Sequence, residues 1–157
     1  MKFSSNEDVE APIETVFGMY SDFDMFERAA LRRGAEIVRT DKLKAPGAGM
    51  AWKASFKFRG RPRLVTGEIV TYDPPEGYVI EAISPNLIGV MSVDLVPLSR
   101  NRTRVSLALE IKPKSLTGRL MVQSLKLGKT RITRRFKVAA ADYAKSLEDR
   151  IASGDTA

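Results

Sequence analysis

The feature that most constrains this chain is a change in the spacing of its apolar residues near residue 113. Between residues 35 and 112, apolar and polar side chains alternate in segments separated by turn sequences, which predicts antiparallel strands. From about residue 116 to residue 151, apolar residues recur at steps of three and four, which predicts one helix of roughly 50 Å. Gly118 and Gly128, near one end, are expected to allow a bend or a close approach to another backbone there. The chain is therefore expected to form a sheet followed by a long amphipathic helix whose apolar stripe lies on the sheet.

The N-terminal part is expected to add one strand and two short helices. Alternation over residues 3–9 predicts the strand, and Pro12 lies where a first helix would begin. Asp22 or Asp24 is expected to cap the second helix, and Gly34 to end it. The further strands are expected at residues 35–41, 52–58, 64–72, 78–84, 88–98 and 102–112.

Length and composition limit the kind of protein this is. The 157 residues fit one domain, expected over residues 1–152, with a frayed tail at 153–157. The chain has no Cys and no His, which excludes disulfides and removes the usual metal ligands and neutral-pH base. We therefore expect no metal and no cofactor. No apolar stretch is long enough for a signal peptide or a membrane span, so a soluble cytoplasmic protein is the simplest expectation.

Several short segments resemble a known superfamily. They lie at residues 9–17, 20–22, 49–52, 72–78, 95–98 and 103–105. They are similar to segments of the START-like, Bet v 1-like (SRPBCC) proteins, which include bacterial polyketide cyclase/dehydrase and lipid-transport-like members. The resemblance implies an α+β helix-grip fold, in which a curved antiparallel sheet wraps around the C-terminal helix and leaves a cavity. Members bind sterols, lipids, polyketides, plant hormones or quinones, and the fold does not decide among them.

Large, adaptable side chains are expected to line such a cavity. The candidates are Trp52, Phe56, Met91, Met121, Leu125, Ile132 and Phe136. The alternative for each of them is plain core packing. Three charged residues, Glu7, Asp94 and Lys129, lie on or near the same stripes and are candidates for orienting a polar group of a ligand. The alternative is that these three side chains reach water.

The resulting hypothesis is a carrier or sensor that binds a hydrophobic or amphipathic small molecule, such as a lipid, a quinone, a sterol-like compound or a polyketide. The alternative is a polyketide cyclase or dehydratase. Without His, its acid and base groups would come from carboxylates or tyrosines, for which Glu7, Asp94, Tyr72 and Tyr143 are candidates. These four form no motif of specific spacing, so no catalytic residue is assigned.

A second alternative is binding to an anionic membrane surface. The net charge is +7, and no acidic residue lies between Glu110 and Asp142. Arg119, Lys126 and Lys137 are expected to project away from the apolar stripe as anion-binding residues; the alternative is an ordinary solvated helix face. Nucleic acid is disfavoured as a partner because the aromatic residues of the helix fall on the apolar stripe. The oligomeric state stays open.

Overall fold

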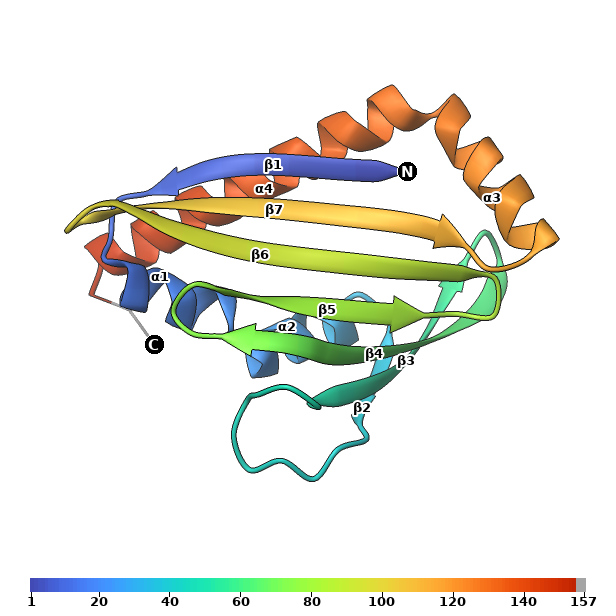
Figure 1. Cartoon of the computed structure of the whole chain (residues 1–157), viewed down its shortest axis with the longest axis horizontal. Helices are drawn as coiled ribbons and strands as arrows, with labels where there is room; N and C mark the ends of the chain where they lie inside the picture. Colours follow the sequence, from blue (N-terminus) through green and yellow to red (C-terminus); the bar gives the residue numbers. More distant parts are fainter. Residues whose placement is uncertain (155–157) are drawn as a thin grey trace.

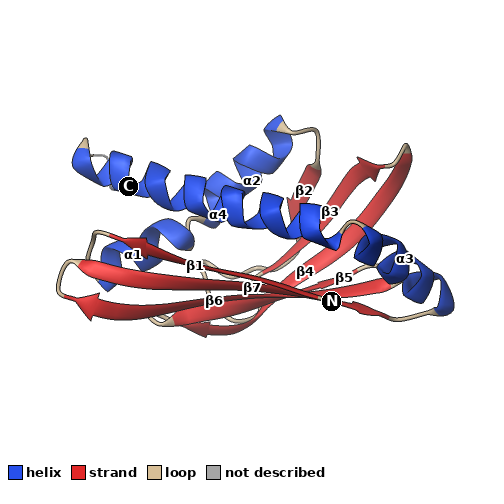
Figure 2. Ribbon diagram, turned by 90° about the horizontal axis from the view of Figure 1, so that it is seen from above, coloured by secondary structure: helices blue, strands red, loops and turns tan. Residues whose placement is uncertain are grey.

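A computed structural model describes residues 1–154, and the last three residues of the expected frayed tail lie outside this range. The described residues form one seven-stranded antiparallel sheet in the order β1-β7-β6-β5-β4-β3-β2, with helices on one side of it (Figures 1 and 2). The strands are β1 (Lys2–Val9), β2 (Glu36–Arg39), β3 (Ala51–Phe58), β4 (Arg61–Asp73), β5 (Gly77–Ile83), β6 (Leu87–Ser99) and β7 (Arg102–Pro113). The expected fold class is confirmed.

Two short helices connect β1 to β2, as expected. They are α1 (Ile13–Tyr20) and α2 (Phe23–Arg32). Asp22 caps α2, since its carboxylate accepts a hydrogen bond from the backbone N–H of Met25 at 3.2 Å. Gly34, just beyond the end of α2, has a φ of 91°, which glycine adopts at little cost.

The C-terminal helix is divided into two at Gly128, one of the two glycines at which a bend was expected. It consists of α3 (Leu116–Leu127) and α4 (Lys129–Ala152), which meet at an angle at Gly128 (Figures 1 and 2). The N–H of Gly128 donates to the carbonyl of Leu125 at 3.1 Å and closes α3. Its own carbonyl accepts the first hydrogen bond of α4, from Ile132 at 3.0 Å. Glycine is a poor residue for a helix interior, and the chain bends there.

One face of the sheet packs against the helices. Because side chains alternate along a strand, Phe3 on β1 faces the same way as its partner Leu109 on β7, and the ring of Phe3 packs against that of Phe136 on α4. The most deeply buried side chains, among them Val9, Val16 and Leu147, lie at the end of the sheet next to α1. The opposite end of the sheet, at the β3–β4 hairpin, is less covered, and there Phe58 remains 44% exposed.

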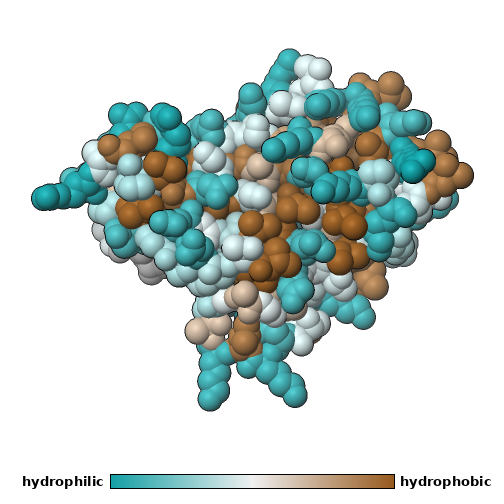
Figure 3. All heavy atoms as spheres, in the orientation of Figure 1, coloured by the Kyte–Doolittle hydropathy of each residue, from teal (hydrophilic) through white to brown (hydrophobic). Residues whose placement is uncertain are grey.

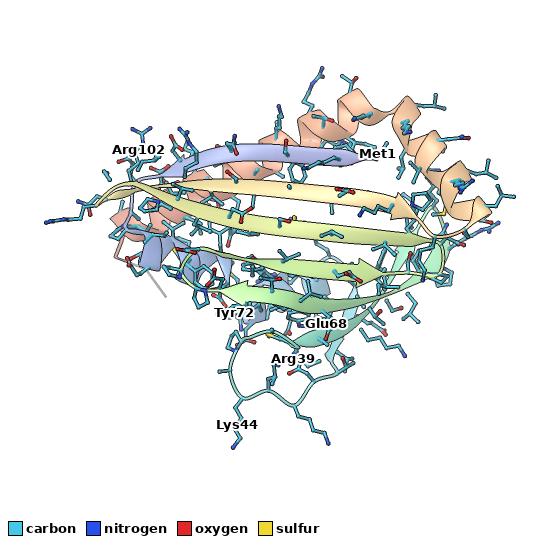
Figure 4. The ribbon with its side chains drawn as sticks, viewed as in Figure 1. Met1, Arg39, Lys44, Glu68, Tyr72 and Arg102 are labelled. Atoms are coloured by element: carbon cyan, nitrogen blue, oxygen red, sulfur yellow. The ribbon has the colours of Figure 1, made fainter. Side chains whose placement is uncertain are left out.

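A single aspartate fixes the loop between β2 and β3. The Asp41 carboxylate accepts two hydrogen bonds from Arg39, the shorter at 2.6 Å, and others from the backbone N–H groups of Leu43 and Ala51 at 2.9 and 2.8 Å. The Arg39 guanidinium and then the Ala51 amide hold the pKa of Asp41 well below its usual range. Lys44 extends from this loop, away from the sheet (Figure 4).

Candidate functional site

A cavity of about 410 Å³ lies at the less covered end of the sheet. Three elements enclose it: the β3–β4 hairpin, the turn from β5 to β6, and α3. Its lining residues are mainly apolar: Phe56, Phe58, Arg59, Pro62, Arg63, Leu64, Val65, Ser84, Pro85, Asn86, Leu87, Met121 and Leu125. This volume falls in the range of ligand pockets, which is roughly 300–1,000 Å³.

The pairing of β3 with β4 determines which hairpin residues face the cavity. Phe56 is opposite Arg63, and Ala54 is opposite Val65, so these side chains share the face that also carries Trp52. From α3, Met121 and Leu125 lie one turn apart and approach the same space. The cavity therefore exists because α3 stands at the end of the sheet and does not lie flat on it.

Close contact with the β5–β6 turn holds α3 in this position. The Ser115 hydroxyl caps α3 by accepting from the N–H of Gly118 at 3.0 Å, and it donates to the Asn86 side chain at 2.8 Å. The N–H of Lys114 donates to the backbone carbonyl of Asn86 at 2.8 Å. Gly118 is buried there, and a Cβ at this position would overlap that same carbonyl oxygen.

The cavity has a cationic character. Among the described residues that line it, Arg59 and Arg63 are the ionisable ones. The Ser84 hydroxyl is already occupied, since it donates to the carbonyl of Leu87 and accepts from the N–H of Leu87. The Nε of Arg63 is buried and has no hydrogen-bond partner within residues 1–154.

A second, more open hollow of about 850 Å³ lies between α2 and the β3–β4 hairpin. Its walls include Phe26 and Ala30 from α2 and Lys57 from β3. Phe56 and Pro62 line both this hollow and the cavity, so these two side chains form the partition between the two spaces.

Of the seven candidate ligand residues, Phe56, Met121 and Leu125 line the cavity. The Trp52 indole lies farther along the sheet, where its Nε1 donates to the Glu27 carboxylate at 2.5 Å and its ring packs 5.6 Å from that of Phe23.

The remaining three candidates lie between the sheet and α4, away from the cavity. Phe136 on α4 packs against the ring of Phe3 at 6.3 Å. Met91 and Ile132 are half-buried, on the inner face of β6 and on α4. Binding of a ligand by any of the seven stays a prediction.

Sequence reasoning missed Arg63 as a cavity residue. It predicted that the fourth strand begins at residue 64, whereas β4 begins at Arg61.

The three charged candidates have different surroundings. Glu7 is half-buried on the inner face of β1, where its carboxylate accepts a hydrogen bond from the Ser5 hydroxyl at 3.2 Å. Asp94 is exposed on the outer face, because its neighbours Val93 and Leu95 occupy the inner one, so its assignment to the inner face was wrong. Lys129 is exposed at the start of α4, which agrees with the alternative that this side chain reaches water.

The tyrosines serve packing in this structure. The Tyr143 hydroxyl donates to the carbonyl of Met19 at 3.2 Å, and burial raises the pKa of Tyr143 to about 12. The ring of Tyr72 packs edge-on against Phe17 at 5.7 Å. The described residues that line the cavity include no carboxylate and no tyrosine, so the acid and base candidates do not converge there.

The basic surface expected on the C-terminal helix is present. Arg119, Lys126 and Lys137 are exposed on α3 and α4. The same side of α3 also presents three leucines to solvent: Leu116, Leu120 and Leu127 are 74%, 60% and 92% exposed. Figure 3 shows hydrophobic and hydrophilic side chains mixed on the surface at this end of the molecule. Within the described part of the chain, no helix combines the length and hydropathy that crossing a bilayer requires.

The arrangement is a helix-grip fold, with a curved antiparallel sheet and helices seated in its concave face. It is the fold of the START-like and Bet v 1-like proteins, as the sequence resemblance implied. No protein-family model matches the chain, and no curated protein has a significantly similar sequence. The evidence for the fold is therefore structural.

Solved structures share the fold over most of the chain. Truncated norcoclaurine synthase from Thalictrum flavum is 15% identical with a TM-score of 0.66, covering 94% of this chain and 92% of that one. The Zhui aromatase/cyclase from Streptomyces sp. R1128 is 13% identical with a TM-score of 0.65, covering 96% and 94%. A START superfamily protein from Mycobacterium smegmatis is 15% identical with a TM-score of 0.53, covering 85% and 95%. The structural similarity establishes the fold, and sequence identities this low leave the ligand undetermined.

Proposed function

We propose that this protein binds a hydrophobic or amphipathic small molecule, as a carrier or a sensor, in the cavity beside α3. The observation that supports this most directly is the apolar lining of that 410 Å³ space, with Phe56, Met121 and Leu125 on its walls. A filled core would bury such side chains completely, whereas Phe56 keeps 37% of its surface exposed. The cyclase alternative lacks comparable support, because the acid and base candidates lie elsewhere.

Native mass spectrometry of the purified protein, followed by solvent extraction, tests for a co-purifying small molecule. Calorimetric titration with lipids, quinones, sterols and aromatic polyketides then gives affinities. In Leu125→Trp the added ring occupies the cavity, and we expect binding to weaken at least tenfold. In the control Leu98→Trp, which places the same ring at a 43% exposed position of β6 outside the cavity lining, we expect affinity within twofold of the wild type. No bound species and no affinity across the panel, or equal affinities for both variants, would refute the proposal.

The leucines of α3 favour a second candidate function, docking on an anionic membrane surface. At 100° per residue, Leu116, Leu120 and Leu127 fall on one side of the helix, opposite the cavity-facing Met121 and Leu125. Exposed apolar residues bordered by cationic ones are typical of helices that lie in the plane of a bilayer. Arg119 and Lys126 border this stripe, and each basic residue near an anionic surface contributes about 1 kcal/mol.

Co-sedimentation with vesicles of phosphatidylcholine and phosphatidylglycerol tests the docking. We expect binding at low salt that falls at high salt, since screening weakens charge attraction. The double variant Leu120→Gln with Leu127→Gln should lower the affinity about tenfold or more, because each leucine contributes apolar burial. The matched control, Val96→Gln with Leu98→Gln, changes two exposed residues of β6 and should bind as the wild type does. Equal binding to pure phosphatidylcholine vesicles would contradict the electrostatic part.

A further inference from the structure

A buried donor of Arg63, unpaired among the described residues, indicates a class of ligand for the cavity that this residue lines. Arg63 lies on β4 opposite Phe56, so its side chain follows the cavity face of the hairpin. Its Nε is buried without a hydrogen-bond partner within residues 1–154. None of the ion pairs formed among these residues involves Arg63. One donor of the guanidinium, its Nε, is therefore buried without a partner among these residues, beside a largely apolar wall, while the residue as a whole is half-buried.

A buried donor that lacks a hydrogen-bond partner is unfavourable, because it has lost its contact with water without gaining an acceptor. The polar side chains of Ser84 and Asn86 also line the cavity, but their hydrogen bonds go to Leu87 and Ser115 and neither pairs with the Nε of Arg63. A planar guanidinium matches two oxygens of a carboxylate or phosphate, and these charge-assisted bonds are stronger than neutral ones.

We infer that the ligand of this cavity is an amphipathic anion, whose carboxylate or phosphate head pairs with Arg63 and whose apolar tail lies against Met121, Leu125 and Leu87. This inference rests on the proposed function and adds the charge of the ligand to it. Arg59, also on the lining, adds positive potential at the same wall. The absence of carboxylates from the described lining residues means that no side chain of the site repels such a head group.

Calorimetric titration with a matched set of probes tests the inference. The probes are dodecanoate, dodecyl phosphate, dodecanol and inorganic phosphate, each below its critical micelle concentration where one exists. The wild type should bind dodecanoate or dodecyl phosphate about ten- to a hundredfold more tightly than dodecanol, as expected for hydrogen bonds to a charged group. Inorganic phosphate alone should bind weakly, because it lacks the tail.

Substitutions locate the effect. Arg63→Met should lower the affinity for the anions to that for dodecanol and leave dodecanol unchanged. Arg63→Lys keeps the charge without the planar fork and should give an intermediate affinity. The control Lys53→Met removes one positive charge from the opposite face of the same hairpin and should keep the full anion preference. Circular dichroism and thermal unfolding establish that each variant is folded.

The outcomes separate the inference from the proposed function. Equal wild-type affinities for dodecanoate and dodecanol, or an anion preference that survives in Arg63→Met, would overturn the role of Arg63 while leaving a neutral-ligand site. Binding of neither dodecanol nor the anions would overturn the proposed function itself. Inorganic phosphate binding as tightly as dodecyl phosphate would point to a free anion and overturn the amphipathic ligand. If Arg63→Met does not fold, the wild-type comparison and Arg63→Lys still decide.

Discussion

Replacing Gly118 by Ala should destabilise this protein, against the usual effect of that substitution in a helix. A Cβ at position 118 would overlap the carbonyl oxygen of Asn86 and lie 3.1 Å from its carbon and 3.4 Å from the Cα of Pro113. All three atoms belong to the backbone, so no side chain can rotate away. Either α3 or the β5–β6 turn must move.

The magnitude follows from two opposing effects. Overpacking a filled site costs typically 1–3 kcal/mol, and a backbone overlap belongs at the upper end of that range, near ~3 kcal/mol. Alanine in place of glycine in a helix contributes about 1 kcal/mol in the other direction. The net loss is about 2 kcal/mol. For a chain of this length that corresponds to a fall in Tm of about 4–8 °C.

Urea denaturation followed by circular dichroism measures this loss directly. Gly18→Ala is the matched control, because Gly18 is an exposed residue of α1 and a Cβ there meets nothing within 4 Å. It should raise the free energy of unfolding by about 0.5–1 kcal/mol. A Gly118→Ala protein as stable as the Gly18→Ala protein would refute the reasoning about the contact between α3 and the turn.

Two further outcomes can be measured. Tyr78→Phe should lower the free energy of unfolding by about 1–2 kcal/mol, because the Tyr78 hydroxyl donates to the Tyr20 carbonyl at 2.6 Å in the core. Tyr20→Phe should lower it less, since the Tyr20 hydroxyl is buried without a partner among residues 1–154. Equal losses for the two variants in urea titrations would contradict this. Asp41→Asn should lower Tm at pH 7. Because the pKa of Asp41 is lower in the folded than in the unfolded protein, the difference in Tm between variant and wild type should shrink as the pH falls below about 4. A difference that stays constant with pH would contradict the direction of the pKa shift.

The fold was predictable because local patterns agree with tertiary structure. The alternation in residues 102–112 predicted which side chains of β7 face the core, and among them Thr103 and Val105 are fully buried. Capping by Asp22 was also read correctly, since the capping bond is local. Such features depend on neighbours along the chain, and a single sequence contains that information.

The site was harder to predict because it depends on distant elements. Gly118 and Gly128 indicated where the helix could bend or approach another backbone. Apolar residues at steps of three and four continue across Gly128, however, so the pattern does not reveal that α3 stands at the end of the sheet. Asp94 was assigned to the wrong face because a shift of one residue reverses every side chain in a strand. Arg63 lies before the alternation becomes regular, and only the pairing with Phe56 shows where it lies.

The pairing of β1 with β7 has a consequence for how the chain reaches this structure. The N-terminal amine donates to the carbonyl of Ile111, 110 residues away, and the whole ladder of β1 depends on a strand that is made late in synthesis. Contacts of such long range slow folding, because the intervening chain must first be ordered. During synthesis β1 therefore lacks its partner strand until β7 has been made. Refolding should proceed from the β3–β6 hairpins, with closure of β1 as the last and slowest step.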